Sequence, residues 1–429
     1  MMNNTKKYGR DFTLVVVGQI VSLFGNAILR FSLPLYLLRE TGSSTLFGIV
    51  TACSFLPMIV LSLLGGVLAD RVNKRNIMVC LDFLSASVIT VFSWLLGTAP
   101  MIPLFIVALM LLYGISGTYQ PTVQASIPAL VPKEKILSAN AIVNQIGALA
   151  GFLGPVVGGM LYGAFGIGLI LKVSILCFTL SAIMEIFIKI PFHRRPTQGS
   201  VFQIVKGDSQ DSIGFLKFDK PIFIRVCIVV AGLNLFLSSM ITIGIPVIIT
   251  QKLFLTDQLL GVTQGLLAVG GILGGLLTVL WEKRLRPQKA YIPLFFCAAC
   301  SGLMGVGTAA IGTPLTKYII LSVTGLAITI FSTMFSIQML SVVQAETPQH
   351  LVGKVVACIM TFIMCVQPVG QFMYGILFER FTNPSILIIG VGAISLAIAM
   401  YSKRVLAKLG GSSKHDENSG RSSELNEDV

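Results

Sequence analysis

A short polar stretch lies between two long apolar runs near the start of the chain. It reads Gly65-Gly66-Val67-Leu68-Ala69-Asp70-Arg71-Val72-Asn73-Lys74-Arg75 and is called the 65–75 stretch below. Gly66 allows another backbone to approach closely, because glycine has no side chain. Asp70 can then lie near the positive N-terminal end of a neighbouring helix. These residue types predict a contact between helices.

The bases of the 65–75 stretch need partners of their own. Arg71, Lys74 and Arg75 can pair with lipid phosphates or with a carboxylate such as Asp82, which lies one to two turns into the following apolar run. The alternative is a solvated turn whose bases only fix the membrane orientation. That alternative accounts for the bases but not for the spacing of glycine and acid.

Residues for bond-making chemistry are missing from the sequence. No hydrolytic triad, metal-ligand cluster or G-x-x-x-x-G-K-[ST] phosphate loop occurs, so catalysis and direct ATP coupling are not expected. Cys297 and Cys300 form a C-x-x-C pair inside an apolar run without a nearby histidine or acid, which favours packing over metal binding or redox chemistry. We therefore expect no enzyme activity and no cofactor.

The composition indicates an integral membrane protein. Of the 429 residues, 54% are hydrophobic and 11% charged, and the mean hydropathy is +0.86. A large soluble enzyme would need more polar surface, and nearly uncharged runs of membrane-spanning length recur along the whole chain. Cutting the chain at charges, prolines and polar clusters gives twelve spans: 12–38, 46–69, 76–97, 101–125, 138–163, 167–190, 221–250, 258–281, 290–312, 315–342, 354–379 and 383–402.

The spans are expected to be helices, because they are long and lack the alternation of a membrane β-barrel. The basic residues set their orientation. If the N-terminus is cytoplasmic, Arg30 lies inside a span and all but five of the other lysines and arginines lie on the cytoplasmic side. The five exceptions are Arg39, Lys172, Lys252, Lys317 and Arg380. This bias predicts cytoplasmic termini and explains the net charge of +13 without a nucleic-acid partner.

The spans divide into two groups of six. The predicted organisation is an N-terminal half (1–190), a cytoplasmic linker (191–220), a C-terminal half (221–403) and a disordered cytoplasmic tail (404–429). Leu23, Phe24 and Pro34 recur at one constant offset as Leu235, Phe236 and Pro246, which indicates an internal duplication. The predicted fold is thus an all-α membrane protein with twelve transmembrane helices in two pseudo-symmetric halves, the architecture of an alternating-access carrier.

Two motifs resemble those of the major facilitator superfamily. The 65–75 stretch is similar to the superfamily's loop G-x-L-a-D-r-x-g-r-k, with Asn73 at the glycine position, where asparagine is the next best residue for a left-handed turn. Gly154, Pro155, Gly158 and Gly159 resemble the superfamily's antiporter motif. The resemblance implies the major facilitator fold and a conformational gate that locks and releases one state of a carrier. The residues assigned to this gate are Gly66, Asp70, Arg71, Lys74, Arg75 and Asp82.

The segment Pro121–Asn140 is similar to the corresponding segment of the bacterial macrolide-efflux and enterobactin-exporter group. This resemblance implies a monomeric antiporter in a bacterial inner membrane, surrounded by lipids, that exports an amphipathic organic compound in exchange for protons. The sequence shows no buried acid in the first, fourth or fifth span that would carry the proton. Glu185, near the end of the sixth span, is expected to pair with Lys189 four residues on.

Arg30 is the most prominent charge at membrane depth, and such residues usually face a cavity. The alternative is that Arg30 extends outward towards Glu40. The other polar side chains at this depth, Gln19 among them, are mostly amides and phenols, which suit a bulky cationic or neutral compound or serve as hydrogen bonds between helices. The candidates for a substrate cavity are Arg30, Asn26, Tyr113, Gln120, Asn144, Gln145, Asn234, Gln338, Gln367 and Gln371.

The sequence therefore predicts an efflux carrier for a macrolide-like drug. Two other functions remain open. One is transport of a siderophore or a lysophospholipid. The other is a membrane sensor that uses the same fold without transporting.

Overall fold

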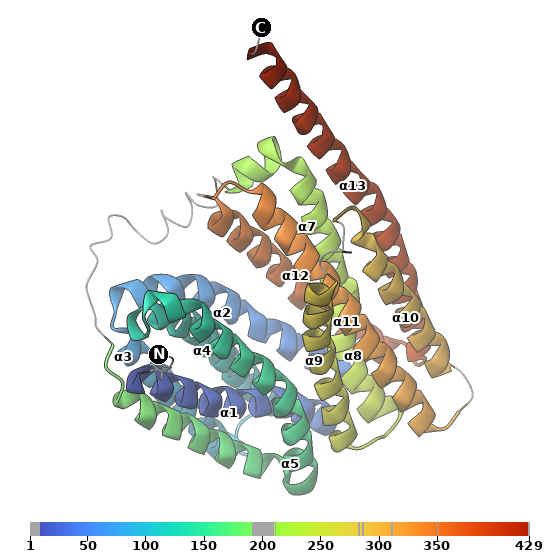
Figure 1. Cartoon of the computed structure of the whole chain (residues 1–429). Helices are drawn as coiled ribbons and strands as arrows, with labels where there is room; N and C mark the ends of the chain where they lie inside the picture. Colours follow the sequence, from blue (N-terminus) through green and yellow to red (C-terminus); the bar gives the residue numbers. More distant parts are fainter. Residues whose placement is uncertain are drawn as a thin grey trace, which may run out of the picture. The chain divides into compact units, whose positions relative to one another are not determined.

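The computed structural model consists of helices and their connections, and no strand occurs in the residues it describes (Figure 1). The described residues are 9–190, 210, 212–281, 284, 287–309, 312–349 and 351–427, with positions 63, 64, 66, 67, 69–71, 137, 287 and 408–427 described by their backbone only. The predicted linker falls largely outside this set.

The α-helices, labelled in Figure 1, are α1 (Arg10–Thr41), α2 (Ser44–Arg71), α3 (Lys74–Leu95), α4 (Met101–Leu130), α5 (Ile136–Ile186), α7 (Pro221–Leu233), α8 (Ser239–Val247), α9 (Asp257–Leu280), α10 (Tyr291–Ala309), α11 (Pro314–Glu346), α12 (Val352–Arg380) and α13 (Pro384–Glu427). Short 3₁₀ turns occur at Lys133–Lys135 and Pro287–Lys289. Three π-helical turns occur at Phe215–Asp219, Asn234–Ser238 and Ile248–Lys252.

Eleven helices among the described residues are long and apolar enough to cross a membrane. One of them, α5, has 51 residues, a length of about 77 Å, whereas a bilayer core is about 30 Å thick. Gly166 interrupts it with φ 70° and ψ −171°, a conformation that glycine tolerates and that redirects the chain. The two parts of α5 match the fifth and sixth predicted spans, and the all-α membrane fold is confirmed.

The chain forms two compact units, each described by itself. Unit 1 comprises Met1–Val201, Ile243–Ala268 and Gln371–Arg380, and unit 2 comprises Phe202–Thr242, Val269–Gly370 and Phe381–Val429. Helix α13 continues to Glu427, beyond the predicted last span. The predicted boundaries of halves, linker and tail stay predictions.

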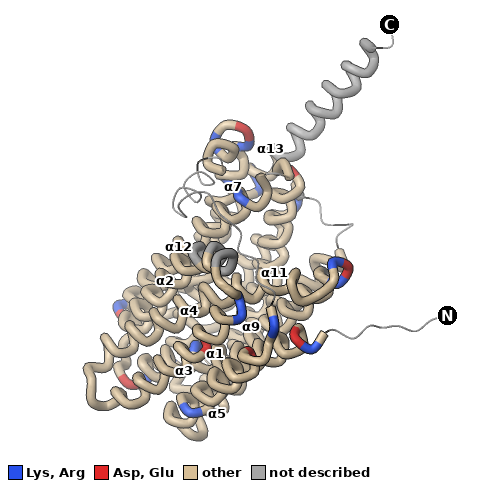
Figure 2. Tube along the Cα trace, turned by 90° about the vertical axis from the view of Figure 1, so that its left-hand side faces the viewer, with Lys and Arg blue, Asp and Glu red and all other residues tan. Residues whose placement is uncertain are grey.

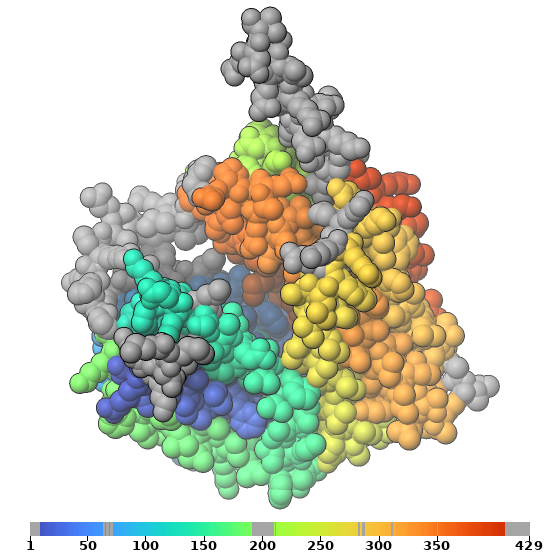
Figure 3. Space-filling view, viewed as in Figure 1, coloured from blue at the N-terminus to red at the C-terminus, as the bar shows by residue number. Residues whose placement is uncertain are grey.

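In unit 1, α1 lies along the second part of α5. Figure 3 shows their blue and green surfaces adjoining. The contact is close because small residues line it. A Cβ atom added to Gly25 would lie 2.7 Å from the Cβ atom of Cys177. The hydroxyls of Ser174 and Ser181 donate to the carbonyl oxygens of Gly25 and Gly18 at 3.2 and 2.9 Å. Close packing and interhelical hydrogen bonds of this kind hold helices together in a membrane.

Unit 1 also contains two glycine crossings that involve helices from late in the sequence. A Cβ atom on Gly159 of α5 would lie 2.7 Å from the carbonyl oxygen of Asp257 and 3.0 Å from the Cα atom of Gly261. A Cβ atom on Gly48 of α2 would lie 2.8 Å from the Cα atom of Gly375 in α12. At both crossings the two backbones lie so close together that a residue larger than glycine would clash.

In unit 2, α10 packs against α11 and α13. The helix that starts at Pro221 meets α12 where Gly370 faces Ser239, whose hydroxyl donates to the carbonyl oxygen of Gln367 at 3.1 Å. The carbonyl oxygen of Asn234 also accepts from Ser239, at 2.8 Å. A π-helical turn at Asn234–Ser238 directly precedes this contact, and such turns often mark functional positions in membrane helices.

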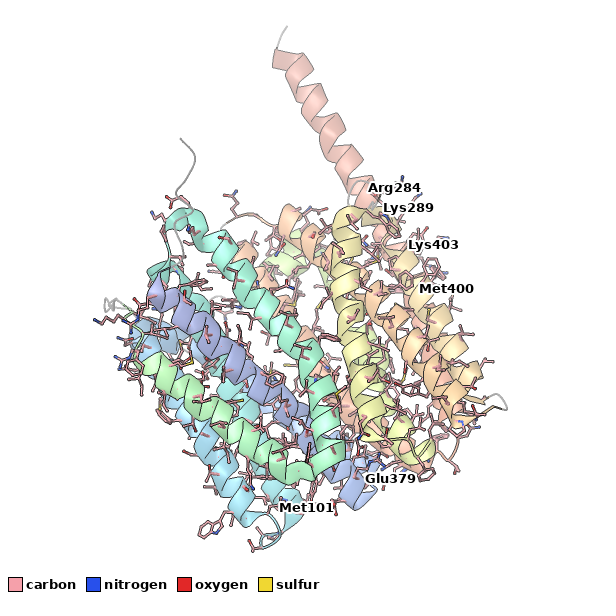
Figure 4. The ribbon with its side chains drawn as sticks, turned by 60° about the horizontal axis from the view of Figure 1, so that its bottom comes forward. Met101, Arg284, Lys289, Glu379, Met400 and Lys403 are labelled. Carbon is pink, nitrogen blue, oxygen red and sulfur yellow. The ribbon has the colours of Figure 1, made fainter. Side chains whose placement is uncertain are left out.

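Charged residues lie mostly near helix ends, and the lengths of the helices contain few of them (Figure 2). In unit 2, Arg284, Lys289 and Lys403 lie at one end of the helices (Figure 4). The Lys403 ammonium is 5.7 Å from the centre of the Tyr291 ring. This distribution is what a bilayer requires, because the hydrocarbon core cannot solvate a charge.

The glycine crossing at Gly159 can be tested against a matched control in the same helix. Gly159→Val should lower the melting temperature of the purified protein by several degrees, because overpacking costs about 1–3 kcal/mol. A side chain on Gly151 would meet nothing within 4 Å, so Gly151→Val should leave the melting temperature nearly unchanged. Equal melting temperatures for the two variants would contradict the close crossing.

Candidate functional site

The 65–75 stretch forms the junction between α2 and α3. Helix α2 ends at Arg71 and α3 begins at Lys74. The prediction of a left-handed turn at Asn73 is wrong, because Asn73 has φ −59°. Its side chain instead accepts a hydrogen bond from the Arg75 backbone nitrogen at 3.0 Å, as an N-cap that satisfies a free donor at the start of α3.

The gate residues are described only in part. Gly66, Asp70 and Arg71 are described by their backbone only, so their role stays a prediction. Lys74 and Arg75 are partly buried, and neither takes part in the ion pairs of the described residues.

Asp82 does not pair with Lys74 or Arg75 as expected. Its side chain is 2% exposed, and its Oδ1 atom accepts a hydrogen bond from the Ser22 hydroxyl of α1 at 2.8 Å. Asp82 lies two helical turns beyond Arg75 on α3, and α3 turns it into the bundle. Asp82 therefore lies on the face of α3 that points into the bundle, where it contacts Ser22 instead of the bases at the start of α3.

Glu185 also has a different partner from the predicted one. It is fully buried, and its Oε1 atom accepts a hydrogen bond from the Tyr119 hydroxyl of α4 at 2.7 Å. Lys189 lies after the end of α5 at Ile186, where its backbone nitrogen donates to Asp11 at 3.1 Å. The predicted Glu185–Lys189 pair is wrong because the helix does not continue far enough to align the two side chains.

Arg30 lies against α4 rather than extending to Glu40. Its guanidinium carbon is 3.6 Å from the centre of the Tyr113 ring, a cation–π contact, and its Nη2 atom is 3.7 Å from the sulfur of Met58. One turn earlier on α1, Asn26 donates to the Ser116 hydroxyl at 2.9 Å. The structure thus brings together three candidates, Asn26, Arg30 and Tyr113, on facing sides of α1 and α4.

The remaining candidates are dispersed. Asn144 and Gln145 are exposed, Gln120 and Gln367 are partly buried, and Gln338 and Gln371 are buried. Asn234 lines a cavity of about 140 Å³ in unit 2 with apolar neighbours that include Phe223, Met339 and Ile359. A cavity of this size is smaller than a typical drug site of about 300–1,000 Å³, and it could hold one apolar group of a ligand.

A group of contacts in unit 1 was not predicted. Arg39 pairs with Asp257 at 2.8 Å and donates to the carbonyl oxygens of Leu255 and Thr250 at 2.8 and 3.3 Å. These four residues are called the Arg39 cluster. Arg39, Leu255 and Asp257 also border a surface cavity of about 720 Å³. Sequence reasoning used Arg39 only for membrane orientation, and no sequence signal connected it with a position more than two hundred residues away.

A second contact of this kind caps α2. The carboxylate of Glu379, labelled in Figure 4, accepts from the Ser43 hydroxyl at 2.6 Å and from the Thr45 backbone nitrogen at 2.7 Å. An acid at the N-terminus of a helix is stabilised by the free backbone donors and by the helix dipole. The end of α12 is therefore held against the start of α2.

The glycines of the predicted antiporter motif lie at helix contacts. Gly154 faces Ala27 and Gly158 faces Phe31, both on α1, whereas Gly159 faces Gly261 of α9. Pro155 lies inside α5, and its carbonyl oxygen would be 2.5 Å from a Cβ atom on Gly261. The motif residues thus let α5 approach two helices at once.

Comparison with known proteins identifies the family. Residues 15–370 match the model of the Major Facilitator Superfamily. The chain belongs to this superfamily. Macrolide efflux protein A of Streptococcus pyogenes is 24% identical over 411 residues, which cover 92% of this chain and 96% of that protein. Multidrug efflux pump Tap of Mycolicibacterium fortuitum is 21% identical over 389 residues, which cover 87% and 90%.

Solved structures agree at the level of the fold. The crystal structure of peptide transporter POT in complex with sulfate has a TM-score of 0.73 and 14% identity, and the match covers 95% of this chain and 96% of that one. The resemblance inferred from the sequence motifs is therefore confirmed. The chain is a multi-pass membrane transport protein and not an enzyme.

The Arg30–Tyr113 contact gives a prediction about stability. Tyr113 is 6% exposed and also packs against Phe55. Tyr113→Ala should lower the melting temperature, because it removes a buried ring, a change that costs about 3–5 kcal/mol for large aromatic residues. Tyr113→Phe keeps the ring and the cation–π contact and should stay close to the wild type. A melting temperature for Tyr113→Phe as low as for Tyr113→Ala would show that the hydroxyl matters instead.

Proposed function

We propose that this protein is an efflux carrier that exports an amphipathic organic compound, such as a macrolide-like drug, by alternating access. The observation that carries the proposal is the likeness to Macrolide efflux protein A along 92% of the chain. The likeness to a multidrug efflux pump along 87% supports the same class. The carrier works as a monomer in a bacterial inner membrane, in contact with lipids and with both termini in the cytoplasm.

The candidate side chains support an amphipathic substrate. Arg30, Tyr113 and Asn26 offer a cation, an aromatic ring and an amide on facing helices, and the cavity beside Asn234 offers an apolar surface. Protons are the proposed coupling ion, and the 65–75 stretch is the proposed cytoplasmic gate.

One observation favours a second class of substrate. Within the described residues, the ion pairs are Arg39–Asp257 and Lys220–Glu346, so Arg30 has no carboxylate partner there. An arginine at membrane depth without a counter-charge is suited to an acidic group of a substrate. Siderophores and lysophospholipids carry such groups, and they form the alternative to a macrolide-like drug.

Drug-susceptibility profiling tests the proposed function. A sensitive strain that expresses the protein should tolerate more of at least one macrolide, dye or siderophore than a strain with the empty vector, and it should accumulate less of that compound. A protonophore should abolish the difference, because it removes the proposed driving force. Unchanged tolerance and accumulation across all three groups would contradict efflux and favour the sensor.

The Arg39 cluster gives a prediction about the transport cycle. Arg39→Asp should reduce efflux several-fold, because it replaces the ion pair with Asp257 by a repulsion. The exchanged variant, with Arg39→Asp and Asp257→Arg together, should recover much of the activity. Lys252→Asp is the control, since it places the same charge change on a neighbouring residue outside the described ion pairs. Efflux by Arg39→Asp at the level of this control would refute a role for the pair.

A further inference from the structure

Two buried carboxyl groups lie in the interior of unit 1, and they are called the acid pair (Asp82 and Glu185). They are 2% and 0% exposed, and they interact with each other electrostatically. Ser181, one turn before Glu185, is also beside Asp82. Helices α3 and α5 therefore bring together two acids that are far apart in the sequence.

Each acid has one oxygen with a donor and one without. Ser22 donates to Oδ1 of Asp82 and Tyr119 donates to Oε1 of Glu185. Asp82 Oδ2 and Glu185 Oε2 are buried and have no hydrogen-bond partner. The Ser181 hydroxyl is engaged with the carbonyl oxygen of Gly18. A buried oxygen without a donor is costly, and a buried charge without a partner more so.

No base compensates the acid pair in the described part of unit 1. The helices packed around it contribute Ser22 from α1 and Tyr119 from α4. Arg75 lies two turns away on α3, and Lys189 lies beyond the end of α5; neither belongs to the ion pairs of the described residues. Two ionised carboxylates would thus leave two uncompensated charges inside the bundle, a state that burial strongly disfavours.

We propose that Asp82 and Glu185 together hold one proton, and that this is where the carrier binds its coupling proton. One proton on either acid removes one of the two buried charges and gives a free oxygen a hydrogen to donate. The inference of coupling rests on the proposed efflux function, whereas the proton site itself rests on the burial of the two acids and on their hydrogen bonds.

Gln19 provides an independent observation. It is 0% exposed, and neither its amide nitrogen nor its amide oxygen has a partner. Gln19 lies one turn before Ser22 on α1, so the two side chains share a face of the helix. A buried amide with both atoms free marks a polar position prepared for a ligand or a water molecule.

A surface cavity lies just beyond the end of α5. It has a volume of about 380 Å³, and its lining is Asn73, Arg75, Ile188, Lys189 and Ile190. Its nearest lining residue along the chain is Ile188, about one turn beyond Glu185.

The acid pair is connected to the candidate substrate residues through two helices. On α1, Ser22 precedes Asn26 and Arg30 by one and two turns. On α4, Tyr119 follows Ser116 and Tyr113 at intervals of three residues. A change in proton occupancy that shifts α1 against α4 would therefore alter the Arg30–Tyr113 contact as well. Coupling between proton and substrate requires one structural element, here the contact between α1 and α4, whose arrangement both of them change.

Infrared spectroscopy of the purified full-length protein tests the proton site without any substrate. At neutral pH the wild type should show the carbonyl stretch of a protonated carboxyl group, and the double variant Asp82→Asn, Glu185→Gln should lose it. Glu346→Gln, which changes an acid paired with Lys220, is the control and should keep it. The absence of this band from the wild type would overturn the proposal.

Tyr119→Phe gives a second spectroscopic readout in case the double variant does not fold. It removes the donor to Glu185 and should shift the band without abolishing it, and an unchanged band would overturn the proposed arrangement. Sodium chloride, compared with choline chloride, should leave the band and the melting temperature unchanged. Loss of the band with sodium would show that the acid pair binds a metal cation instead.

Transport by the double variant tests the coupling. In proteoliposomes loaded with a compound that the susceptibility profile identifies, the double variant should move it down its gradient but lose at least tenfold in pH-driven accumulation. Full pH-driven accumulation would overturn the coupling role. If no compound is transported even by the wild type, the proposed function fails, while the infrared result still decides the proton site.

Discussion

The close contact between α1 and the second part of α5 determines much of what unit 1 can do. In a bilayer, apolar side chains gain little from leaving lipid, so helices associate through close packing and interhelical hydrogen bonds, which average about 0.6 kcal/mol each. Gly25 and Gly18 let α1 approach close enough for the hydroxyls of Ser174 and Ser181 to reach its backbone. This approach also carries Glu185, one turn further on, into the interior beside Tyr119. A wider contact would leave room for water around the acid.

The sequence predicted the elements well, because a membrane-spanning helix needs only a local property, namely enough consecutive apolar residues. The predicted spans 138–163 and 167–190 leave a gap between them, and Gly166, where the structure breaks α5, lies in that gap. The partners of Asp82 and Glu185 were not predictable in this way, since they depend on which faces of four helices meet. Charge spacing favoured Lys189 as the partner of Glu185, but the end of the helix at Ile186 removed that option. The residue type of Asn73 could not decide its conformation in advance, because asparagine is common both in left-handed turns and at helix N-caps.

Arg30 illustrates how a charge can be accommodated at membrane depth without an ion pair. The ring of Tyr113 supplies a negative face to the guanidinium, and such a contact contributes about 2 kcal/mol where water is excluded. That is close to the cost of about 2.5–3.5 kcal/mol for placing arginine at the centre of a helix. The ring therefore offsets much of the cost and leaves the hydrogen-bond donors of Arg30 largely available. A carboxylate partner would have neutralised the charge and used the same donors.

The contacts that hold the ends of helices in unit 1 have a strength that suits a moving protein. The side chains of Arg39 and Asp257 are 31% and 17% exposed, and exposed ion pairs contribute about 0.2–1 kcal/mol. A tenfold difference in the affinity of a ligand for two states is about 1.4 kcal/mol. One bound ligand with such a preference can therefore outweigh the pair. A fully buried ion pair would cost about 3–5 kcal/mol to break, and the proposed cycle would then need a preference of several hundredfold or more. The partial exposure of Arg39 is thus a requirement for reversible opening rather than a defect of packing.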